Sequence, residues 1–407
     1  MTTKRNALVT ILSVLPLSLA LVPSRAAYDL VIIGGGSAGL TAAKFAATFG
    51  KSVAIVEKSR MGGDCTWTGC VPSKTLLAIA KRAHSARTAA DCEYLTLSSP
   101  AKVKVDMAAV KAKVNAIIEK IYDEDDSPAA LEKLGIDTII GAASFVNSDT
   151  LSVEQVDGKL DVSANEGVII ATGAGPSKPS LDGIDGIEYI TYEEVFTLEE
   201  LPARLTVVGG GPIGCELSQA FSRLGSQVTL VAPSLLPNEE PEAGEVLSSV
   251  FRDEGITLVA GRAASVRAAG GGRHVLTVPT AAGSIDVEGD VLLMATGRKP
   301  VVRGMALEKL GVQLAPNGGI EVDTKLRTSC KGVYAAGDCT GDQQFTHYAG
   351  FQGAIAARNI LLPLSDPGVK SAEVPACTFT SPEVRTRLLQ YLLQRTVALQ
   401  LTHSDTG

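Results

Sequence analysis

The sequence predicts an α/β fold with two similar domains, because one strand–turn–helix–strand pattern occurs twice. The first copy reads YDLVIIGGGSAGLTAAKFAATFGKSVAIVEK, and the second reads LTVVGGGPIGCELSQAFSRLGSQVTLVA. Each copy is followed by an Ala-Thr-Gly tripeptide after an apolar run, at residues 171–173 and 295–297. Internal duplication of this kind indicates two α/β domains, each with a dinucleotide site at its Gly-rich turn.

The first copy carries the full pattern of a dinucleotide site. Gly34, Gly36 and Gly39 complete G-x-G-x-x-G directly after the apolar run of residues 30–33. Glycines at these positions allow a tight turn, close approach of the backbone to a pyrophosphate, and close packing of helix on strand. The pyrophosphate would rest on the helix N-terminus. Glu57 ends the next predicted strand, near the spacing expected for a carboxylate that holds ribose hydroxyls.

The second copy repeats the turn but not the acid. Gly209, Gly211 and Gly214 follow another apolar run, and the predicted helix ends at Gly225. Residues 231–233 are Val-Ala-Pro, where a carboxylate would hold the ribose of NAD, and no Arg follows immediately to meet a 2′-phosphate. The sequence therefore leaves the choice between NAD and NADP open.

A third segment is expected to complete the first site. Residues 327–342, RTSCKGVYAAGDCTGD, contain a short apolar strand that ends at Gly337 and Asp338. A carboxylate held at a strand end beside a Gly could reach a polyhydroxylated cofactor chain. Taken alone, a Gly-Asp dipeptide indicates only a turn between secondary-structure elements.

Two cysteines lie just ahead of a predicted helix, in the segment GGDCTWTGCVPSK. Four residues separate Cys65 from Cys70, Pro72 suits a first helical turn, and apolar residues recur at helical spacing over residues 71–86. Cys70 is thus placed at a helix N-terminus, where the dipole and the free N–H groups lower a thiol pKa. Two such sulfurs beside a redox cofactor can pass electrons as a thiol/disulfide pair. The alternatives are an inert disulfide and a structural zinc site, although no second Cys/His pair accompanies them.

Length and composition limit the function further. At 407 residues the chain is too long for one core, which predicts two or three domains. The formal charge of −7, without a basic stripe, argues against nucleic-acid binding. Seven cysteines in so long a chain do not form a disulfide scaffold. Those outside the pair are expected to be small buried hydrophobic residues: Cys92, Cys215, Cys330, Cys339 and Cys377.

Residues 1–26 have the layout of a secretory signal peptide. Lys4 and Arg5 precede the apolar run ALVTILSVLPLSLALV, and Ser24 and Ala26 suit the −3 and −1 positions of a cleavage site. The run barely reaches membrane-spanning length, so an uncleaved anchor is the lesser alternative. We expect the chain to enter the secretory route, or an organelle reached through it, with no stable membrane span after cleavage.

Taken together, these motifs resemble those of the flavin-dependent pyridine nucleotide–disulfide oxidoreductases, which include dihydrolipoamide dehydrogenase, glutathione reductase and mercuric reductase. The similarity runs from about Tyr28 to Pro382, and its GGxCxxxGCxPSK signature is highly specific. It implies two Rossmann-like domains, one for FAD and one for NAD(P)H, followed by the start of an α+β interface domain. After the leader 1–26, the implied ranges are 27–180 and 300–370 for a discontinuous FAD domain, 181–299 for the NAD(P) domain, and 371–407 for the interface segment and tail.

The resemblance also implies roles for individual residues. Cys70 is similar to the sulfur that contacts the flavin, and Cys65 to the one that exchanges with substrate. Lys74 matches a lysine that stabilises negative charge on the reduced flavin, and Glu216 matches its ion-pair partner. The implied catalytic residues are therefore Cys65, Cys70, Lys74 and Glu216. The implied cofactor-binding residues are Gly34, Gly36, Ser37, Ala38, Gly39, Glu57, Lys58, Gly63, Asp64, Lys74, Thr172, Gly173, Gly209, Gly211, Pro212, Ile213, Gly214, Gly297, Gly337 and Asp338.

The implied reaction has two halves. A hydride passes from the nicotinamide to one face of the flavin, and electrons pass from the other face to the Cys65–Cys70 disulfide. The emerging thiol then attacks an external small-molecule or protein disulfide, or a related oxidant. The competing hypotheses are a flavin diaphorase or oxidase that does not use the cysteines, and a non-catalytic flavin-binding protein.

Residues 62–74, which contain Cys65 and Cys70 and are called the redox segment below, depart from the family pattern. Asp64, Thr66, Trp67 and Thr68 differ from the smaller, more apolar residues common there. Trp67 could shape substrate access, but we expect it to pack beside the disulfide. The sequence lacks the C-terminal cysteine pair of the familiar mercuric reductases, so the signature does not establish mercury as the substrate.

The end of the chain departs further. Residues 374–384, VPACTFTSPEV, resemble the opening strand of the interface domain, whereas residues 385–407 match no part of it. The His-Pro-x-x-x-Glu segment that supplies the partner subunit's acid/base is missing, and His403 lacks the Pro and Glu that would follow. We therefore expect impaired turnover with disulfides, a monomeric or poorly soluble product in place of the family's homodimer, and a short amphipathic helix at LLQYLLQ. A frameshifted or alternatively spliced end is an equal explanation of this tail.

Overall fold

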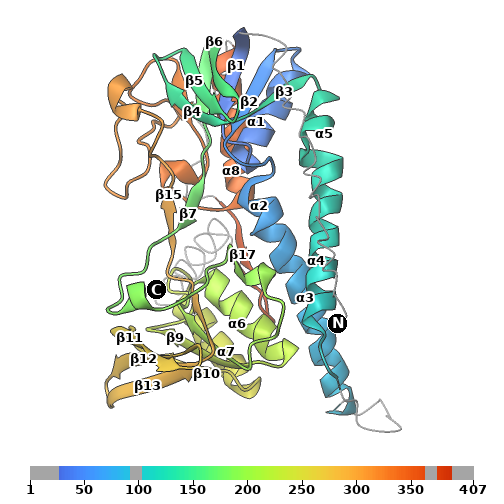
Figure 1. The fold of residues 1–407 in the computed structure, drawn as a ribbon, viewed down its shortest axis with the longest axis vertical. Helices are drawn as coiled ribbons and strands as arrows, with labels where there is room; N and C mark the ends of the chain where they lie inside the picture. The colour runs from blue at the N-terminus through green and yellow to red at the C-terminus, as the bar shows by residue number, and fades with distance from the viewer. Residues whose placement is uncertain (1–26, 92–102, 363–373, 387–407) are drawn as a thin grey trace, which may run out of the picture.

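The computed structural model describes residues 27–91, 103–362 and 374–386. The predicted signal peptide, Cys92, the LLQYLLQ segment and His403 lie outside these described residues. Figure 1 shows two sheets at opposite ends of an elongated molecule, joined by a two-stranded ribbon and by a pair of long helices. The α/β fold class predicted from the sequence is confirmed.

The first sheet has seven strands and a parallel core. In spatial order it contains β3 (Ile136–Ile140), β2 (Val53–Glu57), β1 (Ala27–Ile33), β6 (Gly158–Ile170), β5 (Thr150–Gln155) and β4 (Ala142–Phe145), and β16 (Val333–Ala335) also pairs with β6. Strands β1, β2, β3, β6 and β16 are parallel, whereas β4, β5 and β6 pair antiparallel. Residues 30–33 of β1 are all buried, as expected for a central parallel strand with both faces covered.

Two helices pack together against this sheet. Helix α1 (Ser37–Thr48) follows β1, and α8 (Thr346–Leu361) follows β16. Their contact is close because α8 presents Gly353, where an added Cβ would lie 2.0 Å from the carbonyl oxygen of Ala38. The N-terminus of α8 is thereby fixed beside that of α1.

A long helical arm links the two ends of the molecule. It contains α2 (Gly63–Trp67), α3 (Cys70–Arg87), α4 (Met107–Ile121), a π-helical turn (Tyr122–Asp126) and α5 (Pro128–Glu132). Helices α3 and α4 run side by side, and α3 also packs on α6 of the second unit. Arg87, at the end of α3, donates a 2.9 Å hydrogen bond to the carbonyl of Leu224, at the end of α6. The helix predicted over residues 71–86 is confirmed.

The second sheet has four parallel strands. In spatial order they are β10 (Thr257–Ala260), β9 (Gln227–Ala232), β8 (Arg204–Val208) and β14 (Val291–Met294), with α6 (Pro212–Leu224) after β8 and α7 (Pro241–Asp253) after β9. A separate antiparallel sheet contains β11 (Ser265–Gly270), β12 (Arg273–Thr280) and β13 (Gly283–Gly289). Each duplicated segment therefore forms the predicted strand, Gly-rich turn, helix and strand.

Two short antiparallel ribbons complete the described chain. Strands β7 (Ala174–Pro176) and β15 (Arg298–Pro300) pair where the chain leaves and re-enters the first unit. Strands β17 (Ala376–Thr378) and β18 (Val384–Thr386) form a hairpin, so the single strand predicted over residues 374–384 is wrong. Pro382 explains the break, because it cannot donate a ladder hydrogen bond. Short 3₁₀ turns lie at Thr88–Asp91, Ile184–Gly186, Val195–Thr197, Leu307–Leu310 and Asp338–Thr340. The domain boundaries near residues 180 and 300 stay predictions.

The remaining described cysteines divide into two groups. Cys215 and Cys339 are buried, as predicted. Cys330 and Cys377 are only partly buried, so the prediction is wrong for these two. Cys330 lies in the turn before β16, and Cys377 lies on a two-stranded hairpin, which leaves one face open. Within the described ranges, no helix is both long and apolar enough to span a membrane.

Candidate active site

The outer glycines of the first turn are required by the fold itself. Gly34 has φ +109°, and a Cβ added there would lie 2.3 Å from the carbonyl oxygen of Ala171. A Cβ on Gly39 would lie 1.9 Å from the carbonyl oxygen of Gly34. The second turn repeats this geometry, because Cβ atoms on Gly209 and Gly214 would lie 2.2 Å and 1.9 Å from backbone oxygens. Both turns are thus packed directly against the Ala-Thr-Gly segments that follow β6 and β14.

The middle glycines are not required by internal packing. Gly36 has an ordinary φ of −89°, and the nearest atom to its added Cβ is 3.8 Å away. Gly211 has φ −74° and nothing within 4 Å of the added Cβ. Glycine at these positions therefore fits the close approach of a ligand, as a dinucleotide pyrophosphate would make at a helix N-terminus. On this test the residues present fit FAD at the first turn and NAD(P)H at the second.

Glu57 lies at the end of β2, beside the first turn. Its two carboxylate oxygens accept the N–H groups of Gly35 at 2.8 Å and Ser59 at 2.9 Å. The carboxylate is thus held at the strand end, where the sequence places the ribose-binding acid. The next residue, Lys58, is exposed.

The remaining residues predicted around the first turn are also brought together there. Gly63 packs on the turn so closely that its added Cβ would lie 2.6 Å from the Cα of Gly36. An added Cβ on Gly337 would lie 3.1 Å from that of Ala38. The Cα of Thr172 would lie 3.2 Å from an added Cβ on Gly34. Gly337 and Thr172, which are distant in sequence, thus lie with the first turn at one edge of the sheet.

The cysteine pair lies where three helices begin. Cys65 is in the one-turn helix α2, and Cys70 is the first residue of α3. The two free thiols hydrogen-bond to each other. Thr346 Oγ1, at the start of α8, lies 3.1 Å from Cys70 Sγ, and the hydroxyl of Ser37, at the start of α1, hydrogen-bonds to Cys65. No third ligand that would make a metal site joins the two sulfurs among the described residues.

The two sulfurs differ in acidity. The hydrogen bond from Cys65 lowers the pKa of Cys70 to about 6, with further help from Thr346 and from the Lys74 charge, while burial opposes the shift. The same hydrogen bond, together with burial, raises the pKa of Cys65. Cys70 is therefore the thiolate of the pair at neutral pH, and Cys65 is its proton donor. The predicted placement of Cys70 at a helix N-terminus is confirmed.

Lys74 and Glu216 form an ion pair next to the cysteines. Lys74 Nζ lies 3.1 Å from Glu216 Oε2, and the Glu216 side chain is only 8% exposed. The other carboxylate oxygen accepts the N–H of Phe379 at 2.9 Å. The Phe379 ring also lies under the ammonium group, with Nζ 4.4 Å from its centroid. Sequence reasoning missed Phe379, which belongs to the segment between β17 and β18.

Helix α6 fixes this segment at a second point. One turn after Glu216, the Gln219 side chain accepts the N–H of Ser381 at 2.8 Å and donates to its carbonyl at 2.9 Å. Two side chains of α6 thus bind the backbone between β17 and β18. The hairpin is therefore part of the wall of the site.

Replacing Glu216 tests whether its contacts with Lys74 and Phe379 stabilise the folded protein. In Glu216→Gln, the amide cannot accept from both Lys74 and Phe379, so one donor loses its partner. We expect a loss of roughly 1 kcal/mol in the free energy of unfolding, a figure reduced by the partial exposure of Lys74. The measurement is urea denaturation. The matched control, Glu166→Gln, removes the charge from the 2.6 Å surface pair with Lys51 and should cost less than Glu216→Gln. Equal losses in the two variants would contradict the prediction.

Arg298 joins the redox segment to the third segment of the first site. Its guanidinium pairs with Asp64 and lies 3.3 Å from Asp338 Oδ2. It also lies 5.2 Å from the ring of Tyr192, whose hydroxyl donates to Asp64 at 3.3 Å. Burial raises the pKa of Asp338, and the Arg298 cation partly offsets this effect. Sequence reasoning missed Arg298, although it directly follows the second Ala-Thr-Gly tripeptide.

Trp67 packs away from the cavity. Its indole N–H donates to the carbonyl of Met61 at 2.6 Å, and its ring lies between Arg60, at 3.6 Å, and Tyr122, at 5.0 Å. The neighbouring Thr66 hydroxyl donates to the buried Asp126 at 2.7 Å. Trp67 thus anchors the segment of Cys65 and Cys70 to the π-helical turn and does not line the cavity that these cysteines line.

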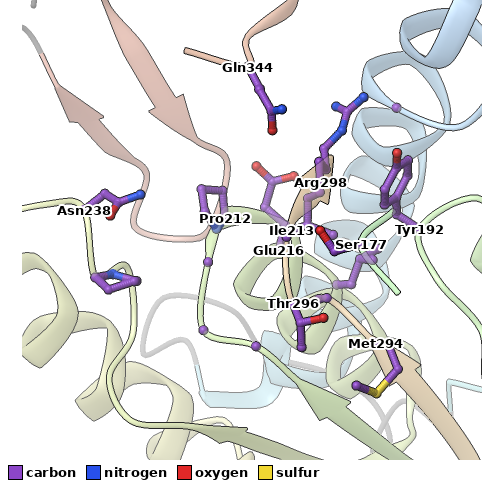
Figure 2. Close-up of a pocket in the computed structure, with 18 of the residues that line it drawn as sticks. Ser177, Tyr192, Pro212, Ile213, Glu216, Asn238, Met294, Thr296, Arg298 and Gln344 are labelled. Carbon is purple, nitrogen blue, oxygen red and sulfur yellow. The ribbon is translucent and has the colours of Figure 1, made fainter. Parts of the chain in front are cut away.

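One cavity of about 1980 Å³ connects the cysteines with the second turn. Figure 2 shows the side chains of Arg298, Glu216 and Gln344 converging on one part of it, with Asn238 at its far side. It exceeds the usual size for one small ligand, so it has room for both a nicotinamide and a substrate. The predicted residues that line it are Asp64, Cys65, Cys70, Lys74, Gly209, Gly211, Pro212, Ile213, Glu216 and Gly297. The other predicted residues do not line it: most lie with the first turn, and Gly214 is buried in α6.

A thiol pair at the meeting point of two dinucleotide-binding units defines a nucleotide-linked thiol–disulfide oxidoreductase. The family described as pyridine nucleotide-disulphide oxidoreductase matches residues 28–353. The chain belongs to this family, whose members are FAD- and NAD(P)-dependent disulfide oxidoreductases.

Individual relatives agree with this assignment. Mercuric reductase of Streptomyces lividans is 36% identical over 88% of this chain and 74% of the relative, and that of Bacillus cereus is 35% identical over 88% of this chain but only 56% of the relative. Dihydrolipoyl dehydrogenase of Bacillus subtilis is 32% identical over 87% of this chain and 76% of the relative. The HOCl-induced flavoprotein disulfide reductase RclA of Escherichia coli superposes with a TM-score of 0.75 at 27% identity, covering 88% of this chain and 77% of that structure.

Proposed function

We propose that this chain passes electrons from NAD(P)H through FAD to the Cys65–Cys70 pair, and from there to an external disulfide or a related oxidant. The observation that carries the proposal is the stabilised Cys70 thiolate, held at the start of α3 beside the starts of α1 and α8. Three helix N-termini concentrate positive potential at this point, which suits a thiolate and a reduced cofactor. FAD, when bound, supplies the transfer between two-electron nucleotide chemistry and the sulfurs.

The chain's own groups account for the proton and the sulfur steps. Two electrons reduce the Cys65–Cys70 disulfide to a thiolate at Cys70 and, after uptake of one proton, a thiol at Cys65. Transfer of this proton along the hydrogen bond to Cys70 makes Cys70 a thiol and leaves Cys65 as the attacking thiolate. Its sulfur bonds to one sulfur of the substrate disulfide, and the other leaves as a thiolate. Cys70 gives its proton to the departing thiolate, and the Cys70 thiolate then attacks the mixed disulfide, which releases the second product and restores the pair.

Anaerobic reduction tests this route. FAD-loaded protein is titrated with NADH and with NADPH while its absorbance spectrum is recorded. We expect a long-wavelength band from the Cys70 thiolate beside oxidised flavin after uptake of two electrons. A flavin that is reduced without this band would contradict the dithiol route.

Serine substitution separates the dithiol route from a simple diaphorase. In a Cys65→Ser, Cys70→Ser double variant, we expect quinone reduction to continue and disulfide reduction to stop. Disulfide reduction at the rate of the unmodified protein would show that the cysteines carry no electrons and would favour the diaphorase.

A further inference from the structure

We propose that the second nucleotide site selects the 2′-phosphorylated cofactor, NADPH, and that Arg262 recognises the 2′-phosphate. The inference rests on the proposed function, because it names the nucleotide for the turn at residues 209–214. It starts from a difference between the two copies of the duplicated unit.

The first copy has a carboxylate beside its turn, and the second has backbone there. Glu57 accepts the N–H of Gly35 at 2.8 Å. The glycine at the same position of the second motif is Gly210, where an added Cβ would lie 2.2 Å from the carbonyl oxygen of Ser234. The chain after β9 is fixed in this place, because the N–H of Leu236 donates to the Gly210 carbonyl at 2.7 Å. The end of β9 therefore has no acid that would hold a ribose 2′-hydroxyl or repel a 2′-phosphate.

The neighbouring strand brings a cation to the same edge. Strand β10 runs parallel to β9, and Ala260 is in register with Ala232, so both strands end together. The N–H of Gly261 donates to the carbonyl of Ala232 at 3.2 Å, which places the next residue, Arg262, at the end of β9. Arg262 lines the same cavity as Ser234 and as the turn at residues 209–212.

The charges around this edge leave Arg262 available. The carboxylates that line the cavity each have a partner elsewhere: Asp64 with Arg298, Glu216 with Lys74, and Asp342 with the Tyr348 hydroxyl. Lys178 also lines the cavity, but it is paired with Asp185 at 3.1 Å. Arg262 is exposed and has no ion-pair partner within the described ranges. A free guanidinium matches the planar, bidentate geometry with which phosphates are bound.

The two cofactors therefore differ in what this edge offers them. A 2′-phosphate would gain the Arg262 cation and meet no opposing carboxylate. The 2′-hydroxyl of NADH would gain no acid and would leave Arg262 without an anion. Arg262 therefore distinguishes the two nucleotides from the end of β10, whereas the residue that usually does so stands at the end of the strand equivalent to β9.

Binding of two adenosine nucleotides to the FAD-loaded protein tests the inference without requiring turnover. Adenosine 2′,5′-bisphosphate and 5′-AMP are compared by isothermal titration calorimetry, and kcat/KM is compared for NADPH and NADH. We expect the 2′-phosphate to improve affinity at least about tenfold. Arg262→Gln should remove most of this preference, and Arg262→Lys should retain part of it. The matched control is Arg303→Gln, which alters an exposed arginine outside the cavity and should leave the preference unchanged.

The outcomes separate the two proposals. Equal affinity for both nucleotides in the unmodified protein, or a preference that survives Arg262→Gln, overturns the role of Arg262 and leaves the electron route standing. Failure of both nucleotides to bind overturns the nucleotide site itself, and with it the proposed function. If Arg262→Gln does not fold, the inference is tested by measuring how the preference of the unmodified protein for adenosine 2′,5′-bisphosphate over 5′-AMP depends on salt. A preference carried by Arg262 must fall as ionic strength rises, and a preference insensitive to salt overturns the inference.

Discussion

Acidification of the FAD-loaded, NADPH-reduced protein is expected to abolish its thiolate–flavin absorbance with a midpoint at a pH of about 6. Above the pKa of Cys70 the sulfur is a thiolate and the band is present, and below it the sulfur is protonated and the band is lost. An ordinary thiol would lose the band near pH 8.5. The measurement is the long-wavelength absorbance as a function of pH under anaerobic conditions.

Three variants identify the cause of this acidity. The hydrogen bond from Cys65 is the largest influence on the pKa of Cys70. Cys65→Ala should therefore raise the midpoint, whereas Cys65→Ser, whose hydroxyl can still donate, should keep it low. In both variants the band forms without NADPH, because no disulfide is present. Cys70→Ser should show no band at any pH and should lower disulfide reduction at least about a thousandfold. Equal midpoints for Cys65→Ala and Cys65→Ser would contradict the role of the hydrogen bond.

Alanine at two glycines of one motif is expected to affect two different properties, stability at Gly39 and FAD affinity at Gly36. In Gly39→Ala, the new Cβ would meet the carbonyl oxygen of Gly34 at 1.9 Å, and backbone cannot move aside cheaply. We expect a destabilisation of about 3 kcal/mol or more, at the upper end of the usual range for overpacking. In Gly36→Ala, the nearest protein atom is 3.8 Å away and φ is ordinary, so the apoprotein should fold normally. Its methyl group would instead occupy space that the pyrophosphate needs, and FAD affinity should fall at least about tenfold.

Thermal unfolding of the apoprotein and fluorescence titration with FAD measure the two effects separately. Gly186→Ala is the control, because this exposed glycine has no heavy atom within 4 Å of its added Cβ and no positive φ. It should change neither stability nor FAD affinity. If Gly36→Ala bound FAD as tightly as the unmodified protein, the middle glycine would not contact the ligand.

The sequence predicted those parts of the site that local patterns determine. The glycine turns, Glu57 at the end of β2 and Cys70 at the start of α3 all lie where expected. Each depends on residues within one strand–turn–helix unit, where periodicity and glycine spacing carry the information. The fold class followed because this unit occurs twice.

The missed residues depend on contacts between distant segments. Arg298 meets Asp64 across 234 positions, Thr346 meets Cys70 across 276, and Phe379 meets Glu216 across 163. No spacing within a window reveals such pairs, because tertiary packing decides them. Of these missed residues, only Arg298 had a signal in the sequence, because it directly follows the Ala-Thr-Gly tripeptide that occurs in both units. The resemblance to the interface domain predicts one strand over residues 374–384, whereas the structure breaks this segment between β17 and β18 at a turn that contains Pro382.

The pairing of β7 with β15 has a consequence for engineering and evolution. Pro176 is opposite Arg298, and Ala174 is opposite Pro300, so the two crossings of the chain are adjacent strands about 4.8 Å apart. The intervening 121 residues, 177–297, therefore form a cassette whose two ends are neighbours. An exchange of this cassette for a homologous module must therefore preserve one junction, at β7 and β15, together with the α6 face that packs on α3.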